Sequence, residues 1–346
     1  MTRVGIVAIG RNEGERLRRC LTSLATNASA CPVVYVDSGS TDGSREVAAE
    51  AGAMVVDLDL STPFTAARAR NEGADRLLAA HPETVFIQFI DGDCELQPGW
   101  VDAALEAITG DRVAIVCGRR RERHPDASIY NRLIDLEWNT PIGEAAACGG
   151  DSLIRTFAFQ QAGGFDRTVI AGEEPELCLR LRRAKWCILR IDHEMAFHDA
   201  AITRFSQWWM RAVRSGYAYA EGAWRYGRGS EHYNVRNIAS ILVWSVGFPV
   251  VGLAATMALW FVLGPLAALV AIGLTVGAYI AQFVKLTVRG VRRDFGGRIA
   301  MAWSASVIIG KFAELVGVLT FARRRILGTD ARLIEYKRSA SSPSAV

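Results

Sequence analysis

The feature that most constrains this chain is a long uncharged block in its second half. Residues 238–284 contain no Asp, Glu, Lys, Arg or His, and Gly264-Pro265 lies near the middle of the block. Two helices of about 20 residues can each cross a bilayer, and a Gly-Pro pair forms a natural tight turn between them. We therefore predict a transmembrane helical hairpin over 238–284. The alternative is a buried hairpin in a soluble protein.

Basic residues flank this block on both sides. They are Arg225, Arg228 and Arg236 before it, and Lys285, Arg289, Arg292 and Arg293 after it. Because positively charged flanks stay on the cytoplasmic side, both ends of the hairpin are predicted to be cytoplasmic, with 216–237 as a juxtamembrane linker. A later apolar stretch, 299–322, contains Lys311 and Glu314 and precedes three arginines. We predict an interfacial or re-entrant helix there, within a basic cytoplasmic segment 285–346.

Charge and cysteine usage exclude several classes of protein. From residue 285 onward there are 12 Lys and Arg against 4 Asp and Glu, although the whole chain is only +4. This basic excess lies beside the apolar block, which favours membrane lipids over nucleic acid as the partner. The seven cysteines include no Cys-x-x-Cys pair, so we expect reduced thiols and neither a disulfide framework nor a zinc site. No signal peptide is expected, because apolar residues 4–9 predict a strand without a cleavage site after it.

The first half alternates short apolar runs with amphipathic stretches. The predicted strands are 4–9, 33–36, 53–58, 85–90 and 113–117, and the predicted helices are 15–25, 44–51, 66–80 and 100–108. In the first helix, Leu17, Cys20, Leu21 and Leu24 recur on one face. This alternation predicts an α/β domain with a mostly parallel sheet flanked by helices.

The strand predicted at 85–90 ends in Asp91-Gly92-Asp93. Ligands bind at the carboxyl ends of strands in open α/β sheets, and hard divalent cations prefer carboxylate oxygens. Two aspartates separated by a glycine can approach one ion. A metal site at Asp91 and Asp93 is therefore one interpretation, and an ordinary strand-ending turn is the other.

Two further acidic segments also contain candidate site residues at the ends of predicted elements. Asp37 ends the second predicted strand, where a carboxylate can accept hydrogen bonds from a nucleoside or simply stabilise a turn. Pro175 fits the first position of a helix, which puts Glu174 at or just before the helix start. The helix dipole favours an ionised carboxylate there, the form that a general base requires. A capping role for these acids is the alternative.

The order of these motifs resembles family 2 glycosyltransferases of the GT-A fold. The matching segments are Val7 to Glu13, Val36 to Ser44, Ala69 to Gly73, Asp91 to Asp93, Gly149 to Ser152, Gly163 to Asp166 and Gly172 to Leu181. They indicate a GT-A domain (Rossmann-like) over 1–215. The closing Leu333-Ile334-Glu335-Tyr336-Lys337 resembles the end of a membrane-attached bacterial branch of this family.

The resemblance implies a role for each donor-site residue. Asp37 would contact the base of a UDP- or GDP-linked sugar, and Arg70 would support the base or the diphosphate. Asp91 would face the ribose or donor sugar and share in the metal site. Asp93 would bind Mn²⁺ or Mg²⁺, with His198 completing the metal or diphosphate site. For Arg70 the alternative is a solvated arginine on a helix face, because Arg68 and Arg76 lie nearby.

The resemblance also implies the groups that act on the acceptor. Glu174 matches the catalytic base, although many relatives have Glu-Asp where this chain has Glu-Glu, so Glu173 stays an alternative base. Asp151 would hold a hydroxyl of the acceptor or donor, or belong to a plain turn. Trp208 and Trp209 would contact the acceptor, or lie on an amphipathic helix at the membrane surface.

These expectations define an inverting, metal-dependent glycosyltransferase at the bacterial inner (plasma) membrane with its catalytic domain in the cytoplasm. The acceptor would be a lipid-linked hydroxyl in the assembly of a surface polysaccharide or glycolipid. One alternative is a sugar nucleotidyltransferase, which would release pyrophosphate. The other is a catalytically silent membrane scaffold with the same fold.

Overall fold

The computed structural model describes residues 4–328. These residues form two compact units, and the chain passes from the first to the second between Ile202 and Thr203. The helix that begins at Phe205 belongs to the second unit, and the sequence-based boundary at 215 falls within this helix. The segment Leu333 to Lys337 and the rest of 329–346 lie outside the described residues.

The first half of the amino-terminal unit is a parallel sheet with the strand order β3-β2-β1-β4. Its elements are β1 (Val4–Gly10), α1 (Glu15–Asn27), β2 (Val33–Asp37), α2 (Ser44–Glu50), β3 (Met54–Asp57), α3 (Ala66–Ala80) and β4 (Phe86–Asp91). Each was predicted to within a few residues. Register pairs Gly10 with Asp37 and Ile9 with Asp91, so both acidic strand ends reach the same edge of the sheet.

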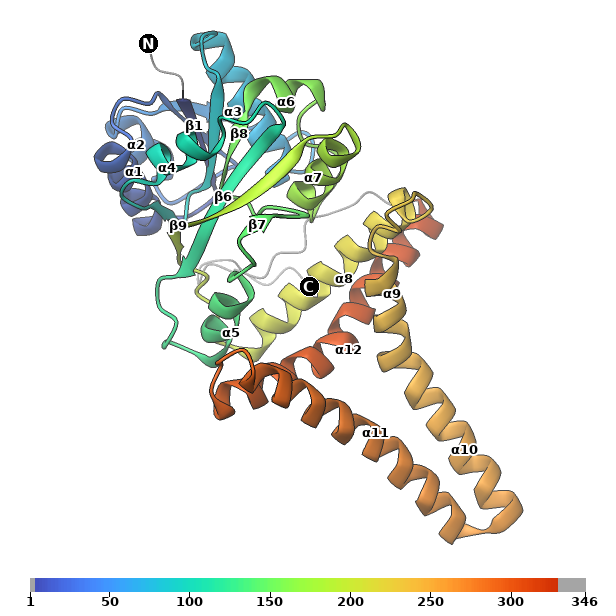
Figure 1. Ribbon diagram of the computed structural model, residues 1–346. Helices are drawn as coiled ribbons and strands as arrows, with labels where there is room; N and C mark the ends of the chain where they lie inside the picture. The colour runs from blue at the N-terminus through green and yellow to red at the C-terminus, as the bar shows by residue number, and fades with distance from the viewer. Residues whose placement is uncertain (1–3, 329–346) are drawn as a thin grey trace. The chain divides into compact units, whose positions relative to one another are not determined.

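The second half adds antiparallel strands to this sheet. The order continues β4-β8-β6-β9-β5, with β7 on β9, and only the β6–β9 pair is parallel. The elements are β5 (Cys94–Leu96), α4 (Trp100–Ala107), β6 (Val113–Glu122), α5 (Ile129–Glu137), β7 (Gly143–Glu144), β8 (Ser152–Arg155), α6 (Thr156–Gln161), α7 (Glu173–Arg183) and β9 (Cys187–His198). The sheet is therefore mixed, and helices flank it as predicted (Figure 1).

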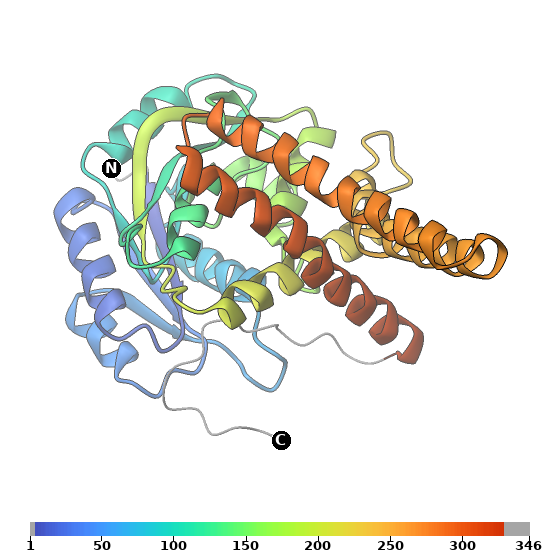
Figure 2. The ribbon, with the colours of Figure 1, turned by 90° about the horizontal axis from the view of Figure 1, so that it is seen from below.

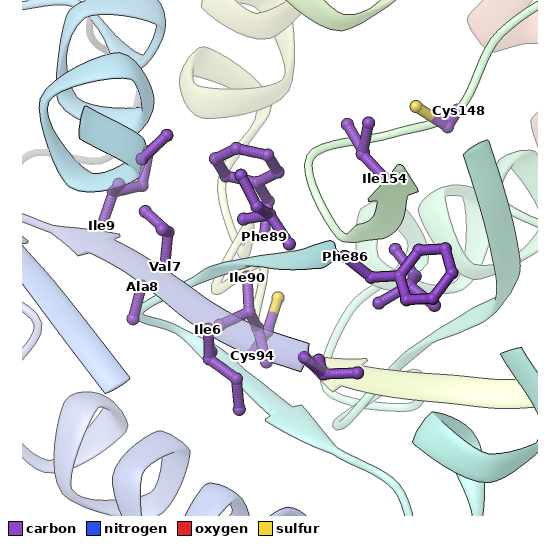
Figure 3. Close-up of a cluster of buried hydrophobic side chains, with 14 of the residues drawn as sticks. Ile6, Val7, Ala8, Ile9, Phe86, Phe89, Ile90, Cys94, Cys148 and Ile154 are labelled. Atoms are coloured by element: carbon purple, nitrogen blue, oxygen red, sulfur yellow. The ribbon is translucent and has the colours of Figure 1, made fainter. Parts of the chain in front are cut away.

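The core fills both faces of the central strands β1 and β4 (Figure 3). On one face Phe89 packs against the rings of Phe159 and Phe165, with both centroid separations at 5.4 Å. On the other face the Trp100 indole donates a hydrogen bond of 2.8 Å to Gln88, which satisfies a fully buried amide. Each such aromatic contributes about 1.5–3 kcal/mol through burial. This packing makes the sheet a rigid support for the acids at its edge.

The second unit is helical. It consists of α8 (Phe205–Tyr226), α9 (Val235–Leu242), a π-helical turn (Val243–Gly247), α10 (Phe248–Leu263), α11 (Pro265–Val291) and α12 (Gly297–Leu327). Helices α10 and α11 converge at the predicted turn, where Gly264 has φ 88° and Pro265 opens α11 (Figures 1 and 2). Among the described residues, three helical segments are long and apolar enough to cross a membrane: Val235–Leu263, Pro265–Val291 and Gly297–Leu327.

Candidate active site

The acidic edge of the sheet begins where β4 ends. Gly92 donates a backbone hydrogen bond of 2.8 Å to Ile9, and a Cβ at this position would lie only 3.0 Å from the same oxygen. Glycine therefore lets the chain turn tightly against β1. The Asp91 carboxylate is partly exposed, whereas Asp93 is buried. The turn thus presents its two acids in different surroundings.

Asp93 lies next to His198. The antiparallel pairing of β5 with β9 puts Cys94 opposite His198, and His198 Nε2 lies 3.3 Å from Asp93 Oδ2. Ligand atoms of Asp93, Cys94 and His198 all lie within 4.8 Å of one another. The buried His198 Nδ1 has no hydrogen-bond partner among the described residues. A carboxylate and an imidazole suit Mn²⁺, so these side chains fit a divalent ion.

Asp91, the third predicted metal ligand, belongs to a neighbouring group. Its ligand atom clusters with those of Cys94 and Asp151, not with that of His198. Arg70 Nη2 contacts Asp91 Oδ1 at 2.7 Å, and Arg120 Nη2 lies 3.8 Å from Asp91 Oδ2. Burial acts to raise the pKa of Asp91, but the two guanidinium groups outweigh it and hold that pKa below its usual value. Asp91 is therefore a stable anion beside the candidate metal ligands.

Arg70 connects this edge to the start of α7. The side chain is 2% exposed, which excludes the alternative of a solvated arginine on a helix face. Its Nη1 lies 2.9 Å from both Glu173 Oε1 and Glu174 Oε1, while Nη2 holds Asp91. A Cβ at Gly150 would lie 2.6 Å from Arg70 Nη2, so only glycine leaves room for this arrangement. One guanidinium thus joins three carboxylates.

Helix α7 begins earlier than the sequence indicated. Gly172, in the left-handed conformation at φ 81°, is the N-cap, and Glu173 is the first helical residue. Pro175 therefore occupies the third helical position, where its missing N–H is still without cost because the first four N–H groups have no intrahelical partner. Both glutamates lie in the first turn, as expected for a base near a helix start.

The electrostatics at Glu174 differ from the expectation based on the helix dipole alone. Burial, followed by the neighbouring Glu173 carboxylate, raises the pKa of Glu174 to about 7, and Arg70 offsets this only in part. A carboxyl group with this pKa can exchange a proton near neutral pH, which suits a general base.

Sequence reasoning missed Arg120 on β6. Its Nε lies 2.8 Å from Asp151 Oδ2, and its guanidinium lies 5.4 Å from the centroid of the Trp138 ring. The same ring packs edge-on against His198 at 4.7 Å. Arg120 Nη2 is buried without a hydrogen-bond partner among the described residues. Trp138 and Arg120 thus connect the Asp91 group with the His198 group.

Asp37 and Asp151 have structural partners. Asp37 Oδ2 accepts hydrogen bonds from the backbone N–H groups of Gly39 and Ser40 at 2.9 and 2.7 Å. Asp151 is fully buried, and its Oδ1 accepts a bond of 2.9 Å from the Asp91 backbone. Burial raises the pKa of Asp151, partly offset by Arg120. Both carboxylates thus support the acidic edge, while their proposed substrate contacts stay predictions.

Trp208 and Trp209 lie on α8 in the second unit. Phe205 packs against both rings, with centroid separations of 5.5 and 5.7 Å. Their predicted contact with the acceptor stays a prediction.

Comparison with known proteins matches residues 6–169 to the family described as "Glycosyl transferase family 2". "Glycosyltransferase AglE" of Haloferax volcanii is 23% identical over 208 residues, which are 57% of this chain and 67% of that protein. "Pre-mycofactocin glycosyltransferase" of Mycobacterium tuberculosis is 29% identical over 201 residues, 52% of this chain. Only 39% of the mycobacterial protein is spanned.

Solved structures agree on the fold. The mannosyltransferase PcManGT from Pyrobaculum calidifontis, in complex with GDP-Man and Mn²⁺, superposes with a TM-score of 0.57 at 15% identity, covering 92% of this chain and 87% of that one. S. aureus TarS 1-349 gives a TM-score of 0.50 at 13% identity, with 89% and 92% covered. Residues 6–169 therefore belong to a glycosyltransferase family 2 domain, and its fold is GT-A.

Proposed function

We propose that this protein is a membrane-attached, inverting glycosyltransferase that transfers a sugar from a UDP- or GDP-linked donor to a lipid-linked hydroxyl. The observation that carries the proposal is the contact of Arg70 with Asp91 on one side and with Glu173 and Glu174 on the other. This contact joins a candidate donor-binding edge to a candidate base. The physiological setting would be assembly of a bacterial surface polysaccharide or glycolipid.

The donor would bind at the carboxyl ends of β2 and β4. Asp37 would contact the base, Asp91 the ribose or sugar, and Arg70 the diphosphate, because a guanidinium matches phosphate geometry. Asp93 and His198 would hold Mn²⁺ or Mg²⁺, and such an ion would stabilise the charge of a nucleoside diphosphate. The neighbour PcManGT, which was solved with GDP-Man and Mn²⁺, supports this assignment by its fold.

Transfer would proceed by single displacement. Glu174 accepts the proton of the acceptor hydroxyl, whose oxygen attacks the anomeric carbon while the bond from that carbon to the diphosphate oxygen breaks on the opposite face. Attack from the opposite face inverts the anomeric centre. Arg70 holds Glu174 at 2.9 Å and so orients its carboxylate. Glu173, 2.9 Å from the same nitrogen, is the alternative base.

A lipid-linked acceptor fits the second unit. Three of its helical segments are long and apolar enough to cross a membrane, and confinement to a bilayer raises the local concentration of a lipid substrate. We place the protein at the bacterial inner membrane with its catalytic domain in the cytoplasm, because basic residues flank both ends of the hairpin.

Nucleotide binding tests the proposal most directly. Detergent-solubilised protein would be titrated with a panel of nucleoside diphosphates, in Mn²⁺ and in chelator. Selective binding of UDP or GDP that requires the ion is expected and would name the donor class. A folded protein that binds no nucleotide would contradict the proposal and favour the silent scaffold.

A further inference from the structure

Helix α12 packs against α11 near its start, where Ala300 lies beside Gly290. Its second half lies along α8, and all three helices belong to the second unit. Figure 1 shows α10 and α11 converging at the turn between them, whereas α8 and α12 run side by side away from that turn. The neighbours of α12 therefore decide whether it can cross a bilayer.

The α8–α12 contact is close and extends over several turns. A Cβ at Gly216 would lie 2.0 Å from the backbone oxygen of Glu314, and a Cβ at Gly317 would lie 2.0 Å from that of Val213. The backbones of α8 and α12 are therefore in direct contact at these two glycines.

Ring contacts extend the same pairing toward the carboxyl ends of both helices. Tyr217 packs edge-on against Phe321 at 5.5 Å, and the Arg325 guanidinium lies 5.3 Å from the Trp224 ring. The contacts extend from Trp208 beside Gly310 to Trp224 beside Arg325, so the two helices run in parallel. The second half of α12 and α8 must therefore take the same position relative to a membrane.

Helix α8 is too polar for the hydrocarbon core. It contains Arg211, Arg214, Glu221 and Arg225, and the last two form an ion pair of 2.7 Å. Charged side chains in the interior of a bilayer are costly, whereas an amphipathic helix is stable in the headgroup region. The pairing with α8 therefore draws α12 toward the membrane surface.

An ion pair near the middle of α12 leads to the same conclusion. Lys311 Nζ lies 2.6 Å from Glu314 Oε2, and both side chains are mostly buried. If α12 crossed the membrane, this pair would lie near the bilayer midplane, because α12 runs from Gly297 to Leu327. At the membrane surface the pair would avoid this cost.

The face of α12 away from α8 is apolar. Ile309, Phe312, Val316 and Leu319 are exposed and recur at helical spacing, while Gly310, Ala313 and Gly317 on the other side are buried. Arg323, Arg324 and Arg325 follow this stripe. An apolar stripe bordered by arginines is the pattern of a helix that lies in the interface of an anionic bilayer.

We propose that α8 and α12 form one platform, made of Phe205–Tyr226 and Gly297–Leu327, that lies in the headgroup region of an anionic lipid bilayer. Of the described residues, only Val235–Leu263 and Pro265–Val291 cross the membrane. The two ends of the chain therefore lie on the same side. This inference concerns lipid contact and topology, so it stands or falls independently of catalytic activity.

Protease protection of the full chain tests the topology. Protein with one epitope tag at each end would be reconstituted into vesicles of phosphatidylcholine and phosphatidylglycerol, and protease would be added outside. We expect the two tags of each molecule to be cleaved or protected together. Cleavage of one tag with protection of the other would mean three spans and would overturn the proposal.

The depth of α12 can be measured with nitroxide labels. Leu319→Cys on α12 would be compared with Leu274→Cys on α11, since both positions are exposed in the structure, and unsubstituted protein would report labelling of the native cysteines. A water-soluble relaxation reagent should act more strongly on position 319, and oxygen more strongly on position 274. Equal depths would overturn the proposal.

Two glycine variants test the pairing of the helices. Gly317→Leu should separate α8 from α12, because the new side chain would meet the Val213 backbone. Gly277→Leu on α11 is the matched control, since nothing lies within 4 Å of its Cβ position. Faster proteolysis of α12 in the first variant alone is expected. Equal rates of proteolysis in both variants would contradict the pairing of α8 with α12. The tag experiment uses unsubstituted protein, so it does not depend on the folding of either variant.

Discussion

Replacing Glu174 with glutamine should stabilise the protein at alkaline pH while it slows sugar transfer by orders of magnitude. Burial and Glu173 raise the pKa of Glu174 from 4.5 to about 7, so the folded protein holds this proton more tightly than the unfolded chain does. Stability is therefore lost as pH rises from about 4.5 to about 7. The full cost, about 3 kcal/mol, is present above pH 7. Glutamine has no proton to lose at this position.

The expected result is a difference in melting temperature that grows with pH. Between pH 5 and pH 8 the Glu174→Gln variant should gain about 2–3 kcal/mol relative to the unsubstituted protein, or about 5–10 °C for a domain of this size. Sugar transfer should fall about 10²–10⁴-fold, the usual contribution of a general base. Nucleotide binding, which does not need the base, should persist.

The assay combines thermal melts of detergent-solubilised protein at pH 5 and pH 8 with a transfer assay at pH 8. Glu46→Gln is the matched control, because Glu46 is also in the first turn of a helix but is exposed. A melting difference that does not change with pH would refute the assigned burial and charge repulsion. Full transfer by Glu174→Gln would move the base elsewhere, with Glu173 first.

Substitutions at three further positions test other parts of the site. Asp93→Asn should abolish ion-dependent nucleotide binding in a titration with and without chelator, while the melting temperature in chelator shows that the variant still folds. Arg120→Met should lower donor affinity and transfer at least 10-fold. Arg120→Lys should rescue little, because only a guanidinium can contact Asp151 through Nε and also lie over the Trp138 ring. Full activity of the methionine variant would exclude a role of Arg120 in donor binding. Gly150→Ala should lower transfer about 10-fold or more by displacing Arg70, because a displacement of 1 Å can cost about 10²-fold in rate. Unchanged kinetics would show that Arg70 and Asp91 can shift without loss of activity.

The sequence predicted the helices and strands that have a clear hydrophobic period. It also predicted the acidic residues that end the apolar strands. The strand β4 is apolar except for Gln88 and ends in Asp91, so the sequence indicated both that the strand is buried and that its carboxyl end carries an acid. The start of α7 was harder to locate, because Pro175 suits any of the first helical positions. Strands β5, β7 and β8 have only two to four residues and carry no periodic signal.

Arg120 shows what the sequence could not provide. Three consecutive arginines suggest a solvated run, and the predicted strand stopped before them at Cys117. In the structure β6 continues to Glu122, and strand alternation turns Arg119 and Arg121 toward Asp135 while Arg120 faces Asp151. Only the pairing of β6 with β9, which is more than 60 positions distant, extends the strand that far.

The balance of charge at the site gives a final argument for a cation. The guanidinium groups of Arg70 and Arg120 contact four carboxyl groups, those of Asp91, Asp151, Glu173 and Glu174. A fifth carboxyl group, that of Asp93, lies beside His198. With all carboxyl groups ionised, the acids exceed the arginines. The raised pKa of Glu174 relieves part of this excess by allowing one proton to stay. A divalent ion at Asp93 and His198 would relieve more of it, and would compensate a diphosphate placed beside these acids. We therefore expect chelator to weaken binding of the nucleoside diphosphate far more than binding of the uncharged nucleoside.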